Sequence, residues 1–309
     1  MITTITFNPA IDRMYKVNEI NIGEVQRVVE TKATAGGKGL NVTRVCKILG
    51  ENPLAMGFLG GFNGAFIKNE LDKNDIRSRF TMINQETRNC LNIIEDSKVS
   101  TEFLEKGPVI SEQDIKSFEN NLMAVINETD IIAASGSCAQ NMPADYYRKI
   151  GEICKANDVK FVLDTSGNAL KEALKSNPYL IKPNTDEIRQ ILDVDVNSRE
   201  EIISAGKKLL EMGPENVCIS LGKDGMVYIC KDGVYDVKIP VVEAVNTVGS
   251  GDSTIAGFCV GISRGYDIEM LLKFANACGI SNALNEKTGF VKIEEVNKYM
   301  NLVNVKKIG

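Results

Sequence analysis

Short apolar runs alternate with segments of helical periodicity along most of this chain. The runs predict strands at residues 2–7, 54–60, 130–135, 160–166, 179–184 and 216–222. Apolar residues at helical spacing between them predict helices near 38–50, 64–74, 111–127, 143–157 and 198–212. This alternation is typical of a mostly parallel sheet covered by helices on both faces, so the sequence predicts an α/β fold.

A different pattern interrupts this rhythm in the first third of the chain. A small sheet projecting beside the main one is predicted from the β-rich segments 77–83, 88–96 and 101–106. Residues 225–230 and 233–240 predict a hairpin, and the sequence from Gly251 to the end is predicted to be helical. No linker or repeat divides the chain, so we expect a single core.

Composition narrows the functional classes. The 309 residues are 43% hydrophobic and 25% charged, which is ordinary for a globular protein, and the net charge of −5 argues against nucleic acid or a membrane surface as partner. No apolar run approaches the roughly 18 residues of a membrane span, and the N-terminus reads as a strand rather than a signal peptide. With no histidine and no C-x-x-C pair, the eight cysteines are expected to be buried reduced thiols, which suits a cytoplasmic protein.

The stretch 246-NTVGSGDSTIAGF-258 carries the strongest chemical signal. Its glycine-rich turn precedes an apolar helix, and the unpaired amides and dipole of such a helix start bind anions. Asp252 can simply stabilise the helix start, but a carboxylate there would repel a bound phosphate. Its presence makes sense if it accepts a proton from an attacking hydroxyl while the amides hold a transferring phosphoryl group.

Two further motifs are weaker alone. The stretch 35-AGGKGLNVTR completes neither a Walker A loop nor G-x-G-x-x-G, and a plain glycine-rich turn explains it equally well. In 182-KPNTDE, Asn184 and Glu187 can orient magnesium-bound water, or they can form a helix cap.

Together the motifs resemble the ribokinase-like carbohydrate kinases of the PfkB family. The similarity covers essentially the whole chain, in the order NPAID, AGGKGLN, KPN-x-x-E and TVGSGD. The stretches 86-ETRNC, 104-LEKGP and 250-SGDSTIAGF look most like the hexose-phosphate branch, which contains the tagatose-6-phosphate kinases and 1-phosphofructokinases. The resemblance implies a three-layer αβα fold with a mostly parallel sheet, in one kinase domain over 1–309 with a β lid from about 10–34 and 86–108.

The resemblance also implies a role for each site residue. Asp252 would be the catalytic base, with Gly249, Ser250 and Gly251 as the anion hole. Asp12, Gly37 and Asn41 would bind sugar hydroxyls, and the phosphate already on the sugar would meet Lys38, Arg88 and Ser137. Arg27 would reach the site of a neighbouring subunit. Mg²⁺ would be organised by Asn184 and Glu187, and ATP would lie against Asn184, Ser220, Leu221, Gly222, Thr247 and Asn276.

The implied reaction is ATP-dependent phosphorylation of a ketohexose monophosphate. Tagatose 6-phosphate is the first choice of substrate and fructose 1-phosphate the alternative. One departure from the family concerns 136-GSCAQNMP, where Ala139 and Asn141 replace the usual proline and glycine. Asparagine tolerates the left-handed backbone conformation, so the turn that carries Ser137 can survive.

Other classes stay open at this point. A kinase of an uncharged sugar or nucleoside would not need Lys38 or Arg88, and a binding module without catalysis would not need an intact G-S-G-D. A dinucleotide dehydrogenase is disfavoured because no complete G-x-G-x-x-G follows a predicted strand. The projecting strands leave edges that a second subunit can cover, so a homodimer formed through the lid is expected.

Overall fold

A computed structural model describes residues 1–97 and 99–309 of the chain. Its larger sheet has ten strands in the order β14-β13-β12-β11-β10-β9-β8-β1-β4-β5. Neighbours from β5 to β11 pair in parallel, and β12, β13 and β14 continue the sheet in antiparallel fashion. The strands are β1 Ile2–Thr6, β4 Leu54–Gly60, β5 Arg77–Ile83, β8 Ile131–Ser135, β9 Lys160–Asp164, β10 Leu180–Ile181, β11 Asn216–Ser220, β12 Met226–Cys230, β13 Gly233–Lys238 and β14 Asn304–Lys307.

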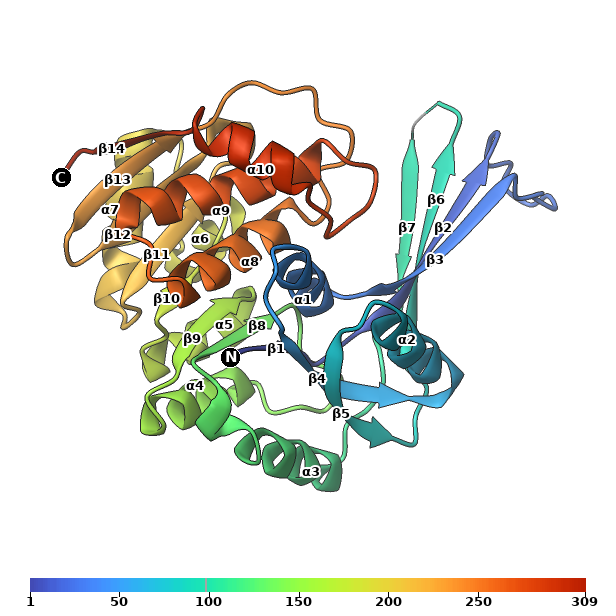
Figure 1. Cartoon of the computed structure of the whole chain (residues 1–309). Coiled ribbons are helices and arrows are strands. Elements are labelled where there is room, and N and C mark those ends of the chain that lie inside the picture. Colours follow the sequence, from blue (N-terminus) through green and yellow to red (C-terminus); the bar gives the residue numbers. More distant parts are fainter. Residues whose placement is uncertain (98) are drawn as a thin grey trace.

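Helices cover both faces of this sheet, as the alternation of strand and helix predicts. Figure 1 shows α8, α9 and α10 together on one side and α3 and α4 on the other. The helices are α1 Lys38–Ile48, α2 Gly61–Lys73, α3 Glu112–Met123, α4 Tyr146–Ala156, α5 Gly167–Ala173, α6 Thr185–Leu192, α7 Arg199–Glu211, α8 Ser250–Ser263, α9 Ile268–Ala283 and α10 Ile293–Met300.

Successive residues of the central strands enter different cores, because side chains alternate across a sheet. In β8, Ile132 packs into the core under α3 to α7, whereas Ile131 packs into the core under α1, α8, α9 and α10. In β4, Phe58 joins the first of these cores, whereas Leu59 joins a third one beneath α2. Strands buried on both faces read as continuous apolar runs, which is why these segments were recognisable in the sequence.

The predicted smaller sheet is present and stands apart from the main one. Its strand order is β3-β2-β6-β7, with bounds β2 Ala10–Val17, β3 Glu30–Gly36, β6 Arg88–Glu95 and β7 Ser100–Leu104. It projects from the body beside α1 and α2 (Figure 1). Strands β2 and β3 follow β1 directly and lead into α1, so this sheet is attached close to the centre of the larger one.

Two sequence predictions were wrong. Residues 77–83 belong to the main sheet rather than the small one: α2 returns the chain so that β5 lies parallel to β4 in a β-α-β unit. The C-terminal region is not helical throughout, because β14 pairs with the edge strand β13. That strand is only four residues long, reads NVKK and is largely exposed, so it carries no apolar pattern.

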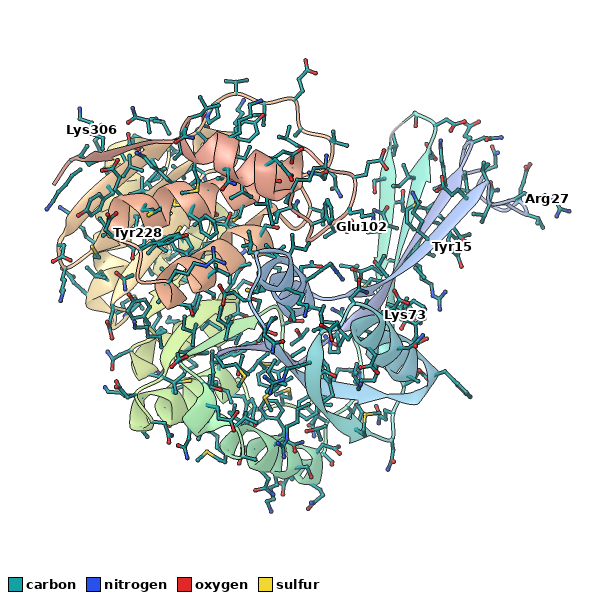
Figure 2. The ribbon with its side chains drawn as sticks, in the orientation of Figure 1. Tyr15, Arg27, Lys73, Glu102, Tyr228 and Lys306 are labelled. Atoms are coloured by element: carbon teal, nitrogen blue, oxygen red, sulfur yellow. The ribbon has the colours of Figure 1, made fainter. Side chains whose placement is uncertain are left out.

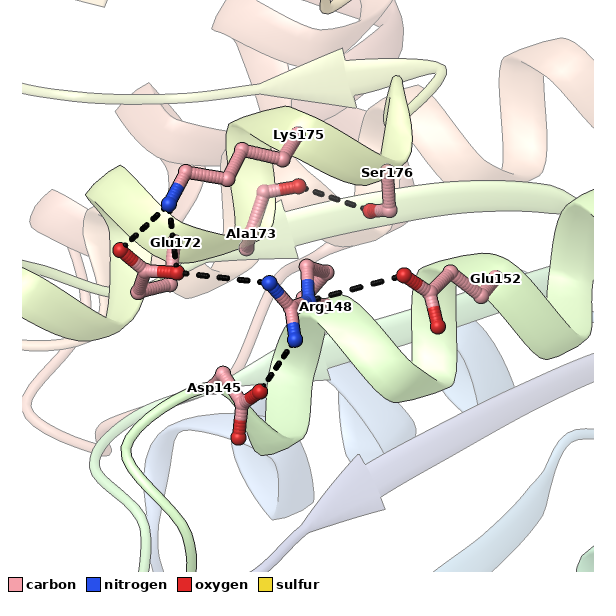
Figure 3. A network of polar contacts seen from close by, with 7 residues as sticks. All are labelled: Asp145, Arg148, Glu152, Glu172, Ala173, Lys175 and Ser176. Carbon is pink, nitrogen blue, oxygen red and sulfur yellow. Dashed lines mark hydrogen bonds and ion pairs between the residues drawn. The ribbon is translucent and has the colours of Figure 1, made fainter.

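A network of charged side chains joins α4 to α5 on the outside of the molecule (Figure 3). Arg148 on α4 pairs with Asp145, lies 3.5 Å from Glu152 and lies 3.7 Å from Glu172 of α5. Glu172 also accepts hydrogen bonds of 2.8 Å from Lys175. Exposed ion pairs of this kind contribute about 0–1 kcal/mol each, so we read the network as support for helix packing.

Candidate active site

Two helix starts meet at the carboxyl ends of the central strands. In the large sheet β1 lies between β4 and β8. The later strands continue away from it in opposite directions, β5 beyond β4 and β9 beyond β8, so the strand order reverses at β1. Ligands of open α/β sheets bind at such a point. Helix α1 begins here with Lys38, and α8 begins with Ser250, and these two helices pack against each other.

Asp252 lies in the first turn of α8 and is buried, with 5% of its surface exposed. Its Oδ2 accepts a 2.8 Å hydrogen bond from Nδ2 of Asn41 on α1. Burial, reinforced by the charge of Asp164, raises the pKa of Asp252 to about 6, although the Asn41 hydrogen bond and the charges of Lys38 and Lys182 oppose the rise. Asp252 does not cap its own helix. A buried carboxylate that titrates near neutrality is suited to accept a proton.

The turn before Asp252 has the geometry of an anion site. Gly249 adopts a φ of 83°, and a Cβ there would lie 2.7 Å from Cγ2 of Thr288, so only glycine fits. Ser250 differs from its predicted role in the anion hole, because its amide donates to the carbonyl of Thr247 at 3.2 Å. Among the described residues, the amides of Gly251 and Asp252 have no hydrogen-bond partner. They are available to a ligand at the helix N-terminus.

A buried ion pair lies beneath this turn, and neither of its members was given a role from the sequence. Lys182 Nζ is 3.2 Å from Oδ2 of Asp164, and both side chains are less than 10% exposed. A Cβ on Gly251 would be 3.2 Å from the same Nζ. The pair therefore places a positive and a negative charge directly under the anion site.

Asp12 faces the start of α1 from the small sheet. A Cβ on Gly36 would lie only 2.1 Å from its carboxylate, so the glycine lets the acid approach the backbone. Burial raises the pKa of Asp12 to about 6 against the charges of Arg44 and Arg88. Gly37 next to it has a φ of 113°. The structure thus brings together the predicted sugar-binding residues Asp12, Gly37 and Asn41.

Arg44 connects these parts. It ends the stretch 35-AGGKGLNVTR, but the sequence predicted no role for it. It donates hydrogen bonds to Oδ1 of Asn41 at 3.0 Å, to the carbonyl of Thr288 at 3.1 Å and to the carbonyl of Ala35 at 2.6 Å. Arg44 donates to the amide oxygen of Asn41, so the amide nitrogen of Asn41 faces Asp252.

The predicted phosphate-binding residues gather where the small sheet joins the body. Arg88 donates to the carbonyls of Asn8 and Glu105, and Asn8 in turn donates from Nδ2 to Ser137 Oγ at 3.4 Å. A cavity of about 390 Å³ at this junction is lined by Gln85, Glu86, Thr87, Arg88, Glu105, Lys106, Gly107, Pro108 and Gln140. Asn8 begins the NPAID stretch, but the sequence predicted a role only for Asp12 of that stretch, so Asn8 was missed as a site residue.

The turn that carries Ser137 keeps its expected shape. Asn141 has a φ of 64°, so it takes the left-handed conformation in place of the family's glycine, as predicted. Lys38 is exposed at the first position of α1. A Cβ on Gly136, the residue before Ser137, would lie 3.7 Å from the Cβ of Lys38. Lys38 and Ser137 therefore border the same opening.

A second cavity, of about 630 Å³, lies at the far side of the anion site. Its lining includes four of the predicted nucleotide-binding residues, Asn184, Ser220, Leu221 and Gly222, together with Arg199 and Lys238. Within the described part of the chain, neither Thr247 nor Asn276 lines this cavity. Thr247 is exposed in the loop before α8. Asn276 is buried in α9 and donates to the carbonyl of Leu272 at 2.8 Å.

Asn184 and Glu187 form a capping box at the start of α6. Asn184 Oδ1 accepts from the Glu187 amide at 2.8 Å, and Glu187 Oε2 accepts from the Asn184 amide at 2.9 Å. Burial raises the pKa of Glu187. The second carboxylate oxygen is not used by the cap, so the pair fits magnesium held through water better than direct ligation by both side chains.

Arg27 does not approach the site within one chain. It is exposed, and Figure 2 shows it at the outer end of the loop between β2 and β3, pointing away from the body.

The chain is similar to known carbohydrate kinases along its whole length. Residues 5–294 match the model of the pfkB family carbohydrate kinases. A tagatose-6-phosphate kinase from Staphylococcus epidermidis is 40% identical over 311 residues, which cover 99% of this chain and 100% of that protein.

Solved structures share the fold. A crystal structure from Staphylococcus aureus, provisionally described as a phosphofructokinase, is 35% identical with a TM-score of 0.87, covering 100% of this chain and 99% of that one. Phosphofructokinase-2 from Escherichia coli has a TM-score of 0.92 at 23% identity, covering 97% of this chain and 98% of that one, which shows the fold alone. This chain belongs to the pfkB family of carbohydrate kinases.

Proposed function

We propose that this protein transfers the γ-phosphoryl group of ATP to D-tagatose 6-phosphate, giving D-tagatose 1,6-bisphosphate. The observation that carries the proposal is the position of Asp252, which is buried, has a pKa of about 6 and lies beside unpaired amides at the start of α8. A carboxylate at an anion-binding turn is unfavourable for mere binding and useful for phosphoryl transfer.

The chemistry follows from these positions. The free terminal hydroxyl of the sugar attacks the γ-phosphorus and gives its proton to Asp252. The new O–P bond forms as the bond between the γ-phosphorus and the β–γ bridging oxygen breaks, and ADP leaves. The amides of Gly251 and Asp252 stabilise negative charge on the transferring group. Asn41 keeps the carboxylate oriented through its 2.8 Å hydrogen bond.

The sugar would lie between the small sheet and α1. Asp12, Gly37 and Asn41 are placed to bind its hydroxyls, and Arg88, Lys38 and Ser137 to bind its phosphate, which carries close to two negative charges near pH 7. Lys106 adds a further cation to the cavity beside Arg88. Closure of the small sheet as a lid would exclude water that otherwise hydrolyses ATP.

The nucleotide would occupy the cavity lined by Asn184, Ser220, Leu221 and Gly222. Glu187 would hold Mg²⁺ through water, and the bound ion would neutralise charge on the β- and γ-phosphates. Thr247, from the loop before α8, and Asn276 of α9 would bind the nucleotide beyond the edge of this cavity.

Fructose 1-phosphate is the alternative substrate, and fructose 1,6-bisphosphate would then be the product. The 35% identical Staphylococcus aureus structure is provisionally described as a phosphofructokinase, which makes a fructose phosphate the second candidate class of substrate. A phosphate on C1 or on C6 can meet the same cations when the sugar is reversed. The 40% identity to a tagatose-6-phosphate kinase makes tagatose 6-phosphate the first choice.

A coupled assay of ADP release tests the proposal. Tagatose 6-phosphate, fructose 1-phosphate, fructose 6-phosphate and unphosphorylated fructose are compared with MgATP. We expect tagatose 6-phosphate to give the highest kcat/KM. Equal turnover of unphosphorylated fructose would refute the roles of Lys38 and Arg88, and a higher kcat/KM for fructose 1-phosphate would select the alternative.

We also propose a cytoplasmic homodimer formed through the small sheet. All eight cysteines are free thiols, and six of them are buried. Within 1–97 and 99–309, no helix is long and apolar enough to cross a membrane. The loop between β2 and β3 exposes Ile22 and Val25, and β7 exposes Phe103, which a second copy can cover. Arg27 from the same loop could then reach the partner's site. A monomeric mass by light scattering would contradict the dimer.

A further inference from the structure

The side chain of Asn282 on α9 is completely buried beside the catalytic turn and makes five hydrogen bonds. Its Nδ2 donates to the carbonyl of Val248 at 2.9 Å and to Ser250 Oγ at 3.2 Å. Its Oδ1 accepts from Ser253 Oγ at 3.1 Å and from the amides of Gly289 and Phe290 at 2.8 and 3.3 Å. Every donor and acceptor of the amide is used, as a fully buried polar group requires.

These bonds hold two segments on either side of the amide. One segment is the turn 248–250, which leads into the anion site. The other is 288–290, which packs directly against that turn: a Cβ on Gly249 would lie 2.8 Å from the backbone nitrogen of Gly289. Asn282 therefore bridges the turn and the segment from the interior. At the surface Asn246 adds a second bridge, because its Oδ1 accepts from the Val248 amide at 3.0 Å and its Nδ2 donates to Thr288 Oγ1 at 3.2 Å.

The segment 288–290 also touches the sugar side of the site. A Cβ on Gly289 would lie 2.8 Å from Cβ of Asn41, and the carbonyl of Thr288 accepts from Arg44. Asn282 thus supports Asp252 in two ways. It holds the turn 248–250, which precedes Asp252, and it holds the segment 288–290, which packs against Asn41.

We propose that Asn282 is a positioning residue for phosphoryl transfer, which rests on the kinase function proposed above. It does not touch the substrates. It fixes the turn, and the turn holds the amides of Gly251 and Asp252 and the Asp252 carboxylate in position around the phosphoryl group that is transferred. Misplacement of such groups by about 1 Å can cost about 100-fold in rate.

Another buried asparagine of the same region provides a matched control. Asn285, directly after α9, donates to the carbonyl of Ser281 at 2.7 Å and to Glu295 of α10 at 2.9 Å. It is 8% exposed, and these two side-chain partners belong to α9 and α10. Its replacement removes a buried amide from the same part of the fold without touching the catalytic turn.

The test compares Asn282→Ala with Asn285→Ala. For Asn282→Ala we expect kcat to fall about 30- to 100-fold, as for loss of a preorganised donor, while KM for the sugar phosphate changes less than about threefold. For Asn285→Ala we expect a lower Tm and a kcat within about twofold of the parent. An equal fall of kcat in both variants, or a kcat within about threefold in Asn282→Ala, would overturn the proposal.

Hydrogen exchange gives a readout that needs no activity. In Asn282→Ala, amides of 247–253 should exchange at least about tenfold faster than in the parent, and in Asn285→Ala they should not. Unchanged exchange in Asn282→Ala refutes the positioning role even if no sugar is ever phosphorylated. A parent protein that phosphorylates none of the four sugars, with exchange as expected, refutes the proposed function and leaves Asn282 as the residue that fixes the turn.

Discussion

Asn41 donates a hydrogen bond of 2.8 Å to Asp252, although 211 residues separate them in the sequence. This bond joins the start of α1, next to the small sheet, to the start of α8, next to the nucleotide cavity. It is the point where the two substrate sides of the site meet.

Replacing Asp252 by Asn removes the proposed base while keeping the size of the side chain. We expect kcat to fall by about 10³-fold, within the range for loss of general-base catalysis, with KM for both substrates little changed. Steady-state kinetics by ADP release measures this. A fall of less than tenfold would mean that Asp252 is not the base.

The pH dependence of turnover should report the same group. The pKa of Asp252 is raised to about 6, and only the ionised carboxylate can accept the hydroxyl proton. We therefore expect kcat to rise as the pH increases through about 6 and then to level off, in a pH profile at saturating substrates. A profile already flat at pH 5 would contradict the raised pKa.

The raised pKa of Asp252 also means that its ionised form destabilises the fold at pH values above about 6. The carboxyl of Asp252 ionises near pH 3.8 in the unfolded chain and near 6 in the folded chain. Its contribution to the free energy of unfolding is therefore fully present below pH 3.8 and is lost as the pH rises through about 6. Asp252→Asn should therefore be more stable than the parent at pH 8, relative to pH 4, by on the order of 2 kcal/mol. Urea unfolding at both pH values measures the difference, and an equal effect at both would refute it.

Replacing Arg88 by Met should weaken binding of a phosphorylated sugar. A hydrogen bond to a charged group contributes about 1.5–3 kcal/mol, so we expect KM for the sugar phosphate to rise about 10- to 100-fold. Turnover of unphosphorylated fructose should not change. Arg79→Met is the control, because Arg79 is exposed on β5 and donates its hydrogen bond to Oδ1 of Asn121 at 3.1 Å, away from the sugar site. Equal loss with both sugars would show that Arg88 supports the fold instead.

Replacing Lys182 by Met leaves Asp164 buried without its partner. Breaking a buried ion pair costs about 3–5 kcal/mol, so we expect a loss of that size in the free energy of unfolding. The double variant Lys182→Met with Asp164→Asn should recover much of it. A double-mutant cycle by urea unfolding checks this, and additive losses would mean that the two charges do not interact.

The periodic parts of the fold could be predicted from the sequence, and isolated contacts could not. Strands such as β8 are apolar on both faces, and the G-S-G-D turn combines glycine conformation with a carboxylate, so both leave a local pattern. The exposed four-residue strand β14 leaves none, because its pairing with β13 depends on tertiary packing. Residues 77–83 were recognised as β-rich, but their sheet was wrong, because the position of a strand depends on the path of α2.

The residues of the site likewise divide into those whose roles the sequence predicted and those whose roles only the structure shows. Asp252, Asn41 and Asp12 lie in motifs, and the structure brings them together. Asn8 and Arg44 lie in the same motifs, and Asn282 lies in an apolar helix. Their roles could not be predicted because they depend on partners up to 244 residues away. Only the folded arrangement shows which polar groups each of them satisfies.

The long separation between Asn41 and Asp252 affects how the protein is made. The small sheet, α1 and most of the parallel strands precede residue 250, so they leave the ribosome before α8 exists. Asp12, Gly37 and Asn41 are synthesised while the carboxylate and the anion-binding turn, which belong to the helix that packs against α1, do not yet exist. Catalytic competence is therefore among the last properties that a newly made molecule acquires.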